Sequence, residues 1–328
     1  MIQIQRQSNS AVTDYYLNVI GGMCAKKEEL YGHSHPLSEC KKNDIIIVPT
    51  ATDFLKVYLR GFRKIIYWMQ GIDSEESYLK HHSMFRKKLL DWVTLFALKR
   101  AKAIFFVSDA MKRYEERKFS IKLDERSFIM PCFNVSKETG INFNEEKYAK
   151  NVFAYVGSLS QWQCFSQTVD FYKRIEDRWK DVEFRVFTFS EDEAKGVLSE
   201  KGVRNYSVRC VAPDQMTTAL KDVKFGFVLR DNIPVNNVAT PTKLSSYLSA
   251  GVIPVYSTSL IDFHDKTRDF TYSVPIEDYT QIPKKLEELM SNHVNYNLLC
   301  KEYNFLFDTY YNPNYYTNMY QERLCRLL

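Results

Sequence analysis

Short apolar runs and longer helical stripes alternate along the first half of the chain. The runs at 43–49, 64–69 and 103–107 are rich in isoleucine, valine and aromatic residues, so each predicts a buried strand. An opening strand at 1–5 and a helix from about 12 to 30 precede them. Strands that alternate with helices are typical of a parallel sheet covered by helices.

A longer amphipathic stripe predicts a helix at 82–101. Phe85, Leu89, Trp92 and Phe96 recur at steps of four, three and four, and basic residues accompany them. A basic amphipathic helix can lie on anionic lipid, but an apolar stripe in an α/β protein is more often packed against the sheet. We therefore expect this stripe to face the sheet.

The polar segment 133–151 has no apolar periodicity and predicts a domain boundary. A second series of elements follows it, with strands expected at 152–156, 182–188, 206–211, 225–229 and 252–256 and helices at 164–179, 191–201, 214–220, 276–290 and 296–307. Two such series predict two Rossmann-like domains, at 1–148 and 149–308, and a last helix within 309–328.

The stretch from 224 to 256 has the strongest chemical signal. Its apolar strand is followed by a polar loop that ends at Thr240 and Pro241. A threonine before a proline predicts a helix start, with Thr240 as the N-cap and Pro241 at the first helical position. Gly251 ends this helix, because glycine readily adopts a positive φ, and the next strand follows.

Arg230 opens that polar loop, and Lys243 lies near the expected helix start. Two cations beside a helix N-terminus after a strand favour an anion such as the diphosphate of a nucleotide. The alternative is that both side chains are solvated at the surface, as most arginine and lysine side chains are. The local pattern alone leaves both interpretations open.

The composition, with 328 residues of which 45% are hydrophobic and 26% charged, is that of a globular protein large enough for two domains. Seven scattered cysteines form no CxxC pair, which favours reduced thiols over a disulfide framework or a zinc site. No signal-peptide pattern opens the chain, and no apolar run is long enough to span a bilayer. We therefore expect a cytoplasmic protein.

Positive charge is concentrated in the first half. Residues 1–150 hold 25 Lys and Arg against 18 Asp and Glu, whereas the remainder holds 20 against 22. A basic half can bind nucleic acid, an anionic membrane surface or a phosphorylated acceptor, and it can also be ordinary solvated surface. The charge alone does not choose among these.

Several nucleotide, metal and hydrolase motifs are missing from the sequence. There is no GxxxxGK(S/T), which argues against a P-loop ATPase, and no GxGxxG after the first strand of either half, which argues against a dinucleotide dehydrogenase. The six histidines form no HExxH pattern, and there is no GxSxG elbow. The sequence therefore predicts no metal site.

A set of short motifs adds a family resemblance, strongest between 152 and 256. The motifs are Arg230-Asp231, Asn237, ATPTKL at 239–244, Tyr247-Leu248, GVIPV at 251–255, YVGS at 155–158 with Trp162, WMQG at 68–71 with EESY at 75–78, and Val107-Ser108 with Met111. Together they resemble the GT-B glycosyltransferases, near the retaining family 4 group.

The resemblance implies an α/β GT-B fold, in which two Rossmann-like domains face each other across a cleft and the helix within 309–328 crosses back to the first domain. It also implies a nucleotide sugar on the C-terminal domain, an acceptor on the N-terminal domain, and neither cofactor nor metal. Arg230 and Lys243 would then clamp the diphosphate and take part in catalysis. The implied donor-binding residues are Gly157, Ser158, Val211, Met216, Arg230, Asn237, Thr240, Thr242, Lys243 and Ser246, and the implied acceptor-side residues are Asn9, Gln70, Gly71 and Asp73.

Two positions depart from the family pattern. Ser246 stands where the family commonly has a glutamate that binds the ribose, and Gln161 and Gln163 occupy a loop where a basic residue is usual. The phosphate half of the site is therefore better supported than the ribose half.

The need for a catalytic base depends on the stereochemistry. In a retaining reaction the leaving phosphate helps to deprotonate the acceptor, whereas an inverting reaction needs a carboxylate base. Asp73, Glu75 and Glu76 follow a strand and are candidates, and Glu75 is the residue we select for catalysis. The alternative is that these acids simply begin a helix, where they interact favourably with its dipole.

These observations predict a cytoplasmic glycosyltransferase that moves a sugar, with retention, from a nucleotide-sugar donor to a glycan or lipid-linked glycan acceptor, as in surface-polysaccharide synthesis. A peripheral contact with the anionic inner face of the cell membrane is part of this prediction, and no nucleic-acid partner is expected. Two alternatives stay open: a GT-B-fold nucleotide-sugar epimerase or hydrolase, and a noncatalytic nucleic-acid-binding protein.

Overall fold

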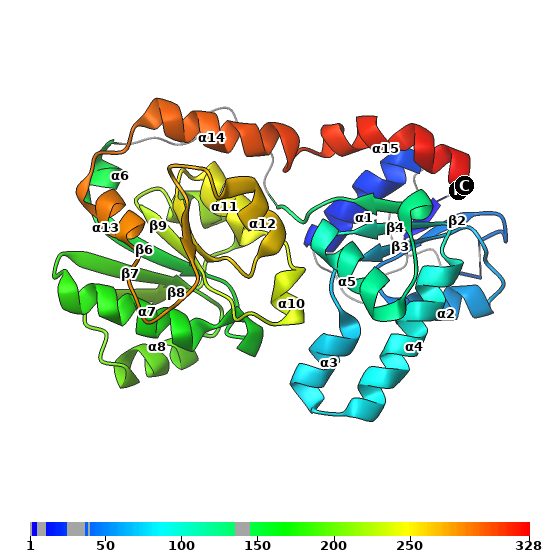
Figure 1. The fold of residues 1–328 in the computed structure, drawn as a ribbon, viewed down its shortest axis with the longest axis horizontal. Coiled ribbons are helices and arrows are strands. Elements are labelled where there is room, and N and C mark those ends of the chain that lie inside the picture. The colour runs from blue at the N-terminus through cyan, green and yellow to red at the C-terminus, as the bar shows by residue number, and fades with distance from the viewer. Residues whose placement is uncertain (1, 5–10, 25–36, 39, 135–144) are drawn as a thin grey trace. The chain divides into compact units, whose positions relative to one another are not determined.

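The computed structural model describes residues 2–4, 11–24, 37–38, 40–134 and 145–328, which divide into two compact units (Figure 1). Unit 1 comprises Met1–Cys132, Asn237–Thr240 and Asn312–Leu328, and unit 2 comprises Phe133–Asn236 and Pro241–Tyr311. The first division falls between Cys132 and Phe133, at the start of the polar segment, whereas the sequence analysis placed it at 148/149, near the end of that segment. Two later segments return to unit 1.

Unit 1 is built around a five-stranded parallel sheet in the order β1-β2-β3-β4-β5. The strands are β1 (Ile2–Ile4), β2 (Ile45–Val48), β3 (Ile65–Met69), β4 (Ala103–Phe106) and β5 (Ser127–Ile129), and the helices are α1 (Ala11–Cys24), α2 (Ala51–Leu59), α3 (Asp73–His81), α4 (Met84–Arg100), α5 (Asp109–Phe119) and α15 (Pro313–Leu327). Strands β3 and β4 are buried along their whole length, as expected for a parallel sheet covered on both faces.

Unit 2 contains a six-stranded parallel sheet in the order β11-β10-β9-β6-β7-β8. The strands are β6 (Asn151–Val156), β7 (Val182–Phe187), β8 (Tyr206–Arg209), β9 (Phe225–Val228), β10 (Ile253–Ser257) and β11 (Val274–Ile276), and the helices are α6 (Glu145–Ala149), α7 (Phe165–Arg178), α8 (Glu191–Glu200), α9 (Met216–Ala219), α10 (Pro234–Asn237), α11 (Lys243–Ser249), α12 (Ile261–Thr267), α13 (Lys284–Ser291) and α14 (Tyr296–Thr309).

The strand order of unit 2 reverses at its centre. The chain runs outward from β6 to β7 and β8, and then returns to the other side of β6 with β9. The carboxyl ends of β6 and β9 therefore form a topological switch point. In open α/β sheets this is the place where ligands bind.

Aromatic side chains make up much of the core of unit 2. The Phe153 ring stacks on Phe225 and Phe227, with ring centroids 4.9 and 5.3 Å apart, and Tyr172 stacks on Phe184 at 4.5 Å. Each such ring removes a large apolar area from water, which contributes about 25 cal/mol per Å². This packing holds β6 beside β9 and so forms the switch point.

The structure contains most of the expected elements within a few residues of their predicted positions. The first expected helix is α1, which ends at Cys24, and residues 25–30 lie outside the described part of the chain. Strands β5 and β11 and helices α6, α10 and α12 were not predicted. These five elements are three to seven residues long, which is too short to show a clear period.

The predicted start of the helix after the polar loop is wrong. Helix α11 begins at Lys243, and Thr242 occupies the N-cap position without a side-chain hydrogen bond. Thr240 lies two residues before this N-cap, and its hydroxyl oxygen accepts a hydrogen bond from the Cys132 amide at 2.9 Å. The predicted end of the helix is confirmed, since Gly251 follows it with φ +67°, and Leu244, Tyr247 and Leu248 form its buried face.

The predicted packing of the α4 stripe against the sheet is also wrong. Phe85, Leu89 and Trp92 are 80%, 53% and 59% exposed, and the buried face of α4 instead consists of Val93, Thr94, Ala97 and Leu98. With 17 residues α4 is about 25 Å long, whereas β3 and β4, the strands that precede and follow it in the chain, span roughly 13 to 17 Å. Its first half therefore extends beyond the sheet.

The predicted last helix is confirmed as α15, which belongs to unit 1 and packs on α1. Asn312 caps it, with its side-chain oxygen accepting from the Asn314 amide at 3.0 Å. The Tyr320 hydroxyl donates to the Ile129 carbonyl at 3.0 Å, which attaches α15 to β5. Among the described residues, none of the helices is long and apolar enough to cross a membrane.

Gly226, in the middle of β9, allows α11 to approach the sheet closely. The Tyr247 ring lies over this glycine, so a Cβ atom at residue 226 would be 2.5 Å from the ring. The Tyr247 hydroxyl also donates to the carbonyls of Ala154 and Phe227, each at 3.4 Å. The side chain of Tyr247 thus holds α11 against β6 and β9.

We expect Gly226→Ala to lower the stability of unit 2 by about 1–3 kcal/mol, because the added methyl group overpacks against a buried ring. The matched control is Gly196→Ala in α8, where the added Cβ meets nothing within 4 Å. The control should stabilise by about 0.5–1 kcal/mol, since alanine is the better helix former. Chemical denaturation measures both changes. Equal effects of the two substitutions would contradict the packing described here.

Candidate functional site

Gly157 and Arg230 lie at the switch point of unit 2. Gly157 directly follows β6, and Arg230 follows β9 after one intervening residue. The Arg230 amide donates to Ser257 Oγ at 2.7 Å, and its carbonyl accepts from Ser259 Oγ at 2.9 Å. These bonds attach the Arg230 backbone to the segment around the end of β10, which leaves its side chain to point back across the site.

The side chains of Arg230 and Lys243 meet on Gln163, the last residue of a short 3₁₀ helix, Gln161–Gln163. Arg230 donates from Nη1 to the Gln163 carbonyl at 2.7 Å and from Nη2 to Gln163 Oε1 at 2.6 Å. Lys243 Nζ donates to the same Oε1 atom at 2.7 Å. One neutral amide oxygen therefore accepts from two cations.

Both cations are buried, with Arg230 4% exposed and Lys243 8% exposed. Burial lowers the pKa of Arg230, and burial together with the neighbouring Arg230 charge lowers the pKa of Lys243 far below its ordinary value. Within the described part of the chain, neither cation forms a salt bridge with a carboxylate. A buried positive pair without a counter-charge is costly, and a bound anion would remove that cost.

Gly157 makes room for this pair of cations. Its φ of +136° is one that residues with a side chain rarely adopt. A Cβ atom at this position would lie 2.8 Å from Lys243 Nζ and 3.4 Å from Gln163 Oε1. The Lys243 ammonium also lies 4.7 Å from the centre of the Tyr155 ring, a favourable cation–π distance.

The structure brings together only part of the predicted donor site. Gly157, Arg230 and Lys243 converge as described, and Ser158 lies in the same loop, with its hydroxyl 3.0 Å from that of Ser160. Val211 and Met216 are half-buried in unit 2. Asn237 and Thr240 belong to unit 1, and Thr242 lies directly before α11.

Ser246, predicted to face the ribose, is 3% exposed and donates to Asn134 Oδ1 at 3.0 Å. The neighbouring Ser245 hydroxyl lies 2.8 Å from the same oxygen. The two serines thus attach the start of unit 2 to α11, and Ser246 already has a partner within the protein.

Glu75, the candidate base, is held in a network of ion pairs between α3, α4 and α5. It accepts from Lys87 at 2.7 Å and from the Tyr114 hydroxyl at 2.8 Å, and it lies 3.5 Å from Lys118 Nζ. Burial raises the pKa of Glu75, but the bonds from Lys87 and Tyr114 outweigh this effect and lower it. These contacts favour a structural role over proton abstraction.

Asp73 and Glu76 differ from Glu75 in having raised pKa values. Burial, followed by the charge of Glu76, raises the pKa of Asp73 to about 6, while burial raises that of Glu76. Of the other acceptor-side predictions, Gln70 is exposed, and Gly71 is a site where a Cβ atom would lie 2.3 Å from Glu76 Oε1. Asn9 lies outside the described residues.

The sequence reasoning did not assign roles to Gln163 and Glu115. Gln163 was noted only as the absence of a basic residue, and a neutral side chain that holds two cations has no sequence signature. Glu115 is fully buried in α5, and neither of its carboxyl oxygens has a hydrogen-bond partner among the described residues. In the sequence, the burial of Glu115 was indicated by its position four residues after Met111, on the same face of the helix.

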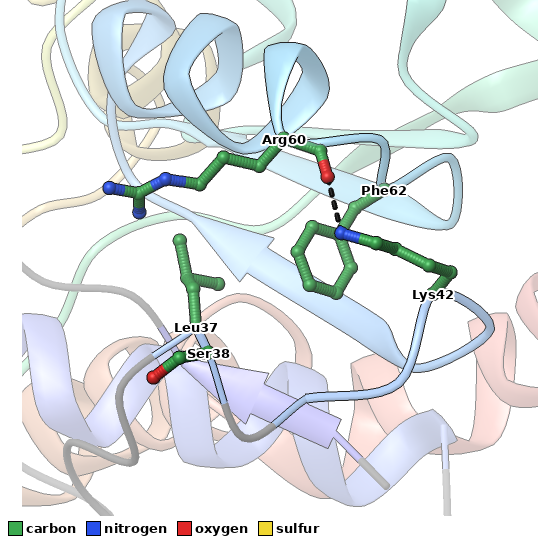
Figure 2. Close-up of a pocket in the computed structure, with 5 residues that line it drawn as sticks. All are labelled: Leu37, Ser38, Lys42, Arg60 and Phe62. Carbon is green, nitrogen blue, oxygen red and sulfur yellow. Dashed lines mark hydrogen bonds between the residues drawn. The ribbon is translucent and has the colours of Figure 1, made fainter.

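A cavity of about 390 Å³ lies in unit 1 and is lined by Leu37, Ser38, Lys42, Arg60 and Phe62 (Figure 2). Lys42 donates to the Arg60 carbonyl, and its ammonium lies 4.6 Å from the centre of the Phe62 ring. These residues precede β2 and β3 and are therefore at the amino ends of the strands. Ligands of open α/β sheets bind at the opposite ends, so we assign no function to this cavity.

No protein-family model and no curated protein matches the sequence. Solved structures do match. A glycosyltransferase from Rickettsia africae is similar with a TM-score of 0.66 at 11% identity, covering 99% of this chain and 97% of that one. Trehalose-6-phosphate synthase OtsA is similar with a TM-score of 0.60 at 9% identity, covering 88% of this chain and 73% of that one. The G117R mutant of S. aureus TarM, in complex with fondaparinux, α-GlcNAc-glycerol and UDP, is similar with a TM-score of 0.65 at 10% identity. The match covers 87% of this chain and 56% of that one.

These similarities establish the class of fold: the chain has the GT-B fold. This confirms the predicted fold of two Rossmann-like units with a last helix that returns to the first. The chain spans little more than half the length of TarM. At 9–11% identity the likeness concerns the fold alone.

We expect the stability of unit 1 to fall between about pH 5 and pH 8 because Glu115 must ionise in a buried site. Burial raises the pKa of Glu115 from 4.5 to about 7, against the smaller, opposite effect of Lys118. A carboxyl whose pKa is raised by folding stabilises the protein most at low pH, and this contribution is lost as the pH rises through the folded-state value. The loss for such a shift is on the order of 3–4 kcal/mol at most.

Glu115→Gln should abolish this part of the pH dependence, since glutamine keeps the shape without the charge. The free energy of unfolding, measured at a series of pH values, should therefore favour the variant increasingly as the pH rises. Glu125→Gln, at an exposed position in the same unit, is the control and should follow the wild-type profile. Parallel profiles for E115Q and the wild type would show that Glu115 does not ionise in this range.

Proposed function

We propose that this chain is a glycosyltransferase that takes a sugar from a nucleoside-diphosphate sugar and transfers it to a glycan or lipid-linked glycan. The observation that carries the proposal is the buried pair of cations, Arg230 and Lys243, which share the Gln163 amide at the switch point. The GT-B fold supports the choice of a sugar nucleotide over other phosphorylated ligands.

The diphosphate would displace the Gln163 amide as the partner of both cations. The Arg230 guanidinium can donate two parallel hydrogen bonds to phosphate, and the Lys243 ammonium adds a point charge. Because these groups are buried in a low dielectric, their interaction with an anion is stronger than at the surface. They would also supply the positive charge that a divalent metal often supplies in phosphate chemistry.

The proposed reaction proceeds with retention of configuration. The bond between the sugar anomeric carbon and the diphosphate oxygen breaks, and the electron pair stays on the diphosphate. The acceptor hydroxyl oxygen bonds to the anomeric carbon on the same face, and its proton passes to the leaving phosphate. Arg230 and Lys243 would stabilise the charge that develops on that leaving group. This scheme needs no carboxylate base, in agreement with the engagement of Glu75 in ion pairs.

The proposed acceptor is a glycan or lipid-linked glycan, and the proposed location is an anionic membrane surface. The basic first half supports an acceptor that is anionic or presented at an anionic surface. A lipid-linked glycan at the inner face of the cell membrane meets this condition. The protein would then work in the cytoplasm with a peripheral membrane contact.

Binding of nucleoside diphosphates tests the donor site. UDP, GDP and ADP are added separately, and we expect one of them to raise the melting temperature by about 2–4 °C at a hundredfold excess over its dissociation constant. Arg230→Ala should abolish the shift and reduce transfer from the matching nucleotide sugar about 100- to 1,000-fold. Arg268→Ala, at an exposed position of unit 2, should behave as the wild type.

Other outcomes of this experiment identify the alternatives. Consumption of a nucleotide sugar at an undiminished rate without any acceptor would indicate a hydrolase or epimerase. Salt-dependent binding of oligonucleotides together with no response to any nucleoside diphosphate would indicate a nucleic-acid-binding protein. Either result would contradict the proposed transfer reaction.

We expect Lys243→Met to stabilise the ligand-free protein by about 1 kcal/mol or more, because it removes a buried charge that has no counter-charge. The same substitution should abolish the response to the nucleoside diphosphate. The matched control is Lys147→Met, which removes a lysine that is 2% exposed and donates to the Ala250 carbonyl at the other end of α11. K147M should keep the ligand response.

The measurement is the unfolding transition of each variant with and without ligand. A K243M protein that is less stable than the wild type and still responds to the ligand would show that Lys243 is a structural residue. The anion site would then have to lie elsewhere.

A further inference from the structure

The first half of α4 presents a cluster of large apolar side chains to solvent. Met84, Phe85, Leu89 and Trp92, here called the hairpin-tip surface, are 51%, 80%, 53% and 59% exposed. Figure 1 shows α3 and α4 as a helical hairpin that extends beyond the sheet of unit 1. Single exposed apolar residues are common on proteins, but four within nine positions of one helix indicate a surface that binds something.

The hairpin is held rigid. His82 adopts a left-handed conformation with φ +50° and ends α3, and Ser83 caps α4 by accepting from the Arg86 amide. The ion pairs of Lys87 with Glu75, and of Lys118 with both Glu75 and Asp91, join α3, α4 and α5. The apolar side chains therefore project from a preformed support.

The exposed charge around this surface is mainly positive, since Asp91, the acidic neighbour of Trp92, is paired with Lys118. The sequence from Ser77 to Leu90 contains Lys80, Arg86, Lys87 and Lys88, together with His81 and His82, and no acidic residue. Arg86 and Lys88 are exposed beside Phe85 and Leu89, whereas Lys87 is engaged with Glu75. An apolar cluster with a basic rim matches an anionic lipid surface, in which headgroups carry the negative charge and acyl chains accept the apolar side chains.

A protein partner fits this surface less well than lipid does. Protein interfaces are depleted in lysine, whereas lysine and arginine at a membrane surface extend their charged ends to the headgroups while their stems pack on apolar groups. The tryptophan within the cluster is also typical of the boundary between headgroups and acyl chains.

We propose that the hairpin-tip surface docks this chain on anionic lipid, with Phe85, Leu89 and Trp92 inserted between the headgroups and Arg86 and Lys88 bound to them. This assigns residues to the membrane contact that the proposed function includes. The assays below involve no nucleotide and no sugar transfer, so their outcome is independent of the donor site.

The test is co-sedimentation with vesicles of equimolar phosphatidylcholine and phosphatidylglycerol, and with vesicles of phosphatidylcholine alone. We expect binding to the anionic vesicles, weaker binding at high salt, and a blue shift of tryptophan emission that is lost in Trp92→Phe while binding remains. The double variants F85S/W92S and R86E/K88E should each bind about tenfold more weakly or worse.

The matched control is Phe305→Ser. Phe305 is 54% exposed on α14, where its charged neighbours at helical spacing are Lys301, Glu302 and Asp308, so it lacks a basic rim. F305S should bind anionic vesicles as the wild type does. Because all the altered side chains are exposed, each variant should keep the wild-type melting temperature, which verifies folding.

Two results would overturn the proposal. One is wild-type binding of anionic vesicles by both double variants. The other is a failure of the wild type to bind vesicles combined with self-association that F85S/W92S abolishes, which would make the surface an interface between two copies of the chain.

Discussion

The structure of the switch point in unit 2 depends on two buried positive charges, Arg230 and Lys243, that share one neutral amide. Arg230 and Lys243 would repel each other unless something accepted hydrogen bonds from both, and Gln163 Oε1 does so. Gly157 must lack a side chain to leave this space, and Tyr247 must lie flat on Gly226 to bring α11 close enough. The arrangement costs stability in the absence of a ligand, which is typical of a binding site that is preformed for charge.

The sequence predicted the architecture of both units because strand and helix periods are local properties. It also predicted that Arg230 and Lys243 lie near each other, since their positions relative to β9 and α11 could be estimated from the same periods. It could not predict Gln163, because the role of a neutral side chain depends on which charges the fold brings to it. Thr240 was misassigned for a related reason: its hydroxyl accepts from the Cys132 amide, which is distant in sequence.

Periodicity also failed to show which face of α4 is buried. Periodicity correctly predicted an amphipathic helix. How much of its apolar stripe contacts the core depends on the length of α4 relative to β3 and β4. That comparison can be made only when the fold is known. Glu75 and Ser246 illustrate the same limit for single residues. Each has the right chemical type for a site, yet each is engaged by partners within the protein, Lys87 and Asn134 among them.

The most direct measurement is a crystal structure of the protein with the nucleoside diphosphate that stabilises it. We expect phosphate oxygens to lie within about 2.7–3.2 Å of the Arg230 guanidinium and the Lys243 ammonium. The Gln163 amide should no longer accept from both cations. A nucleotide bound elsewhere, with Arg230 and Lys243 still sharing Gln163, would contradict the account.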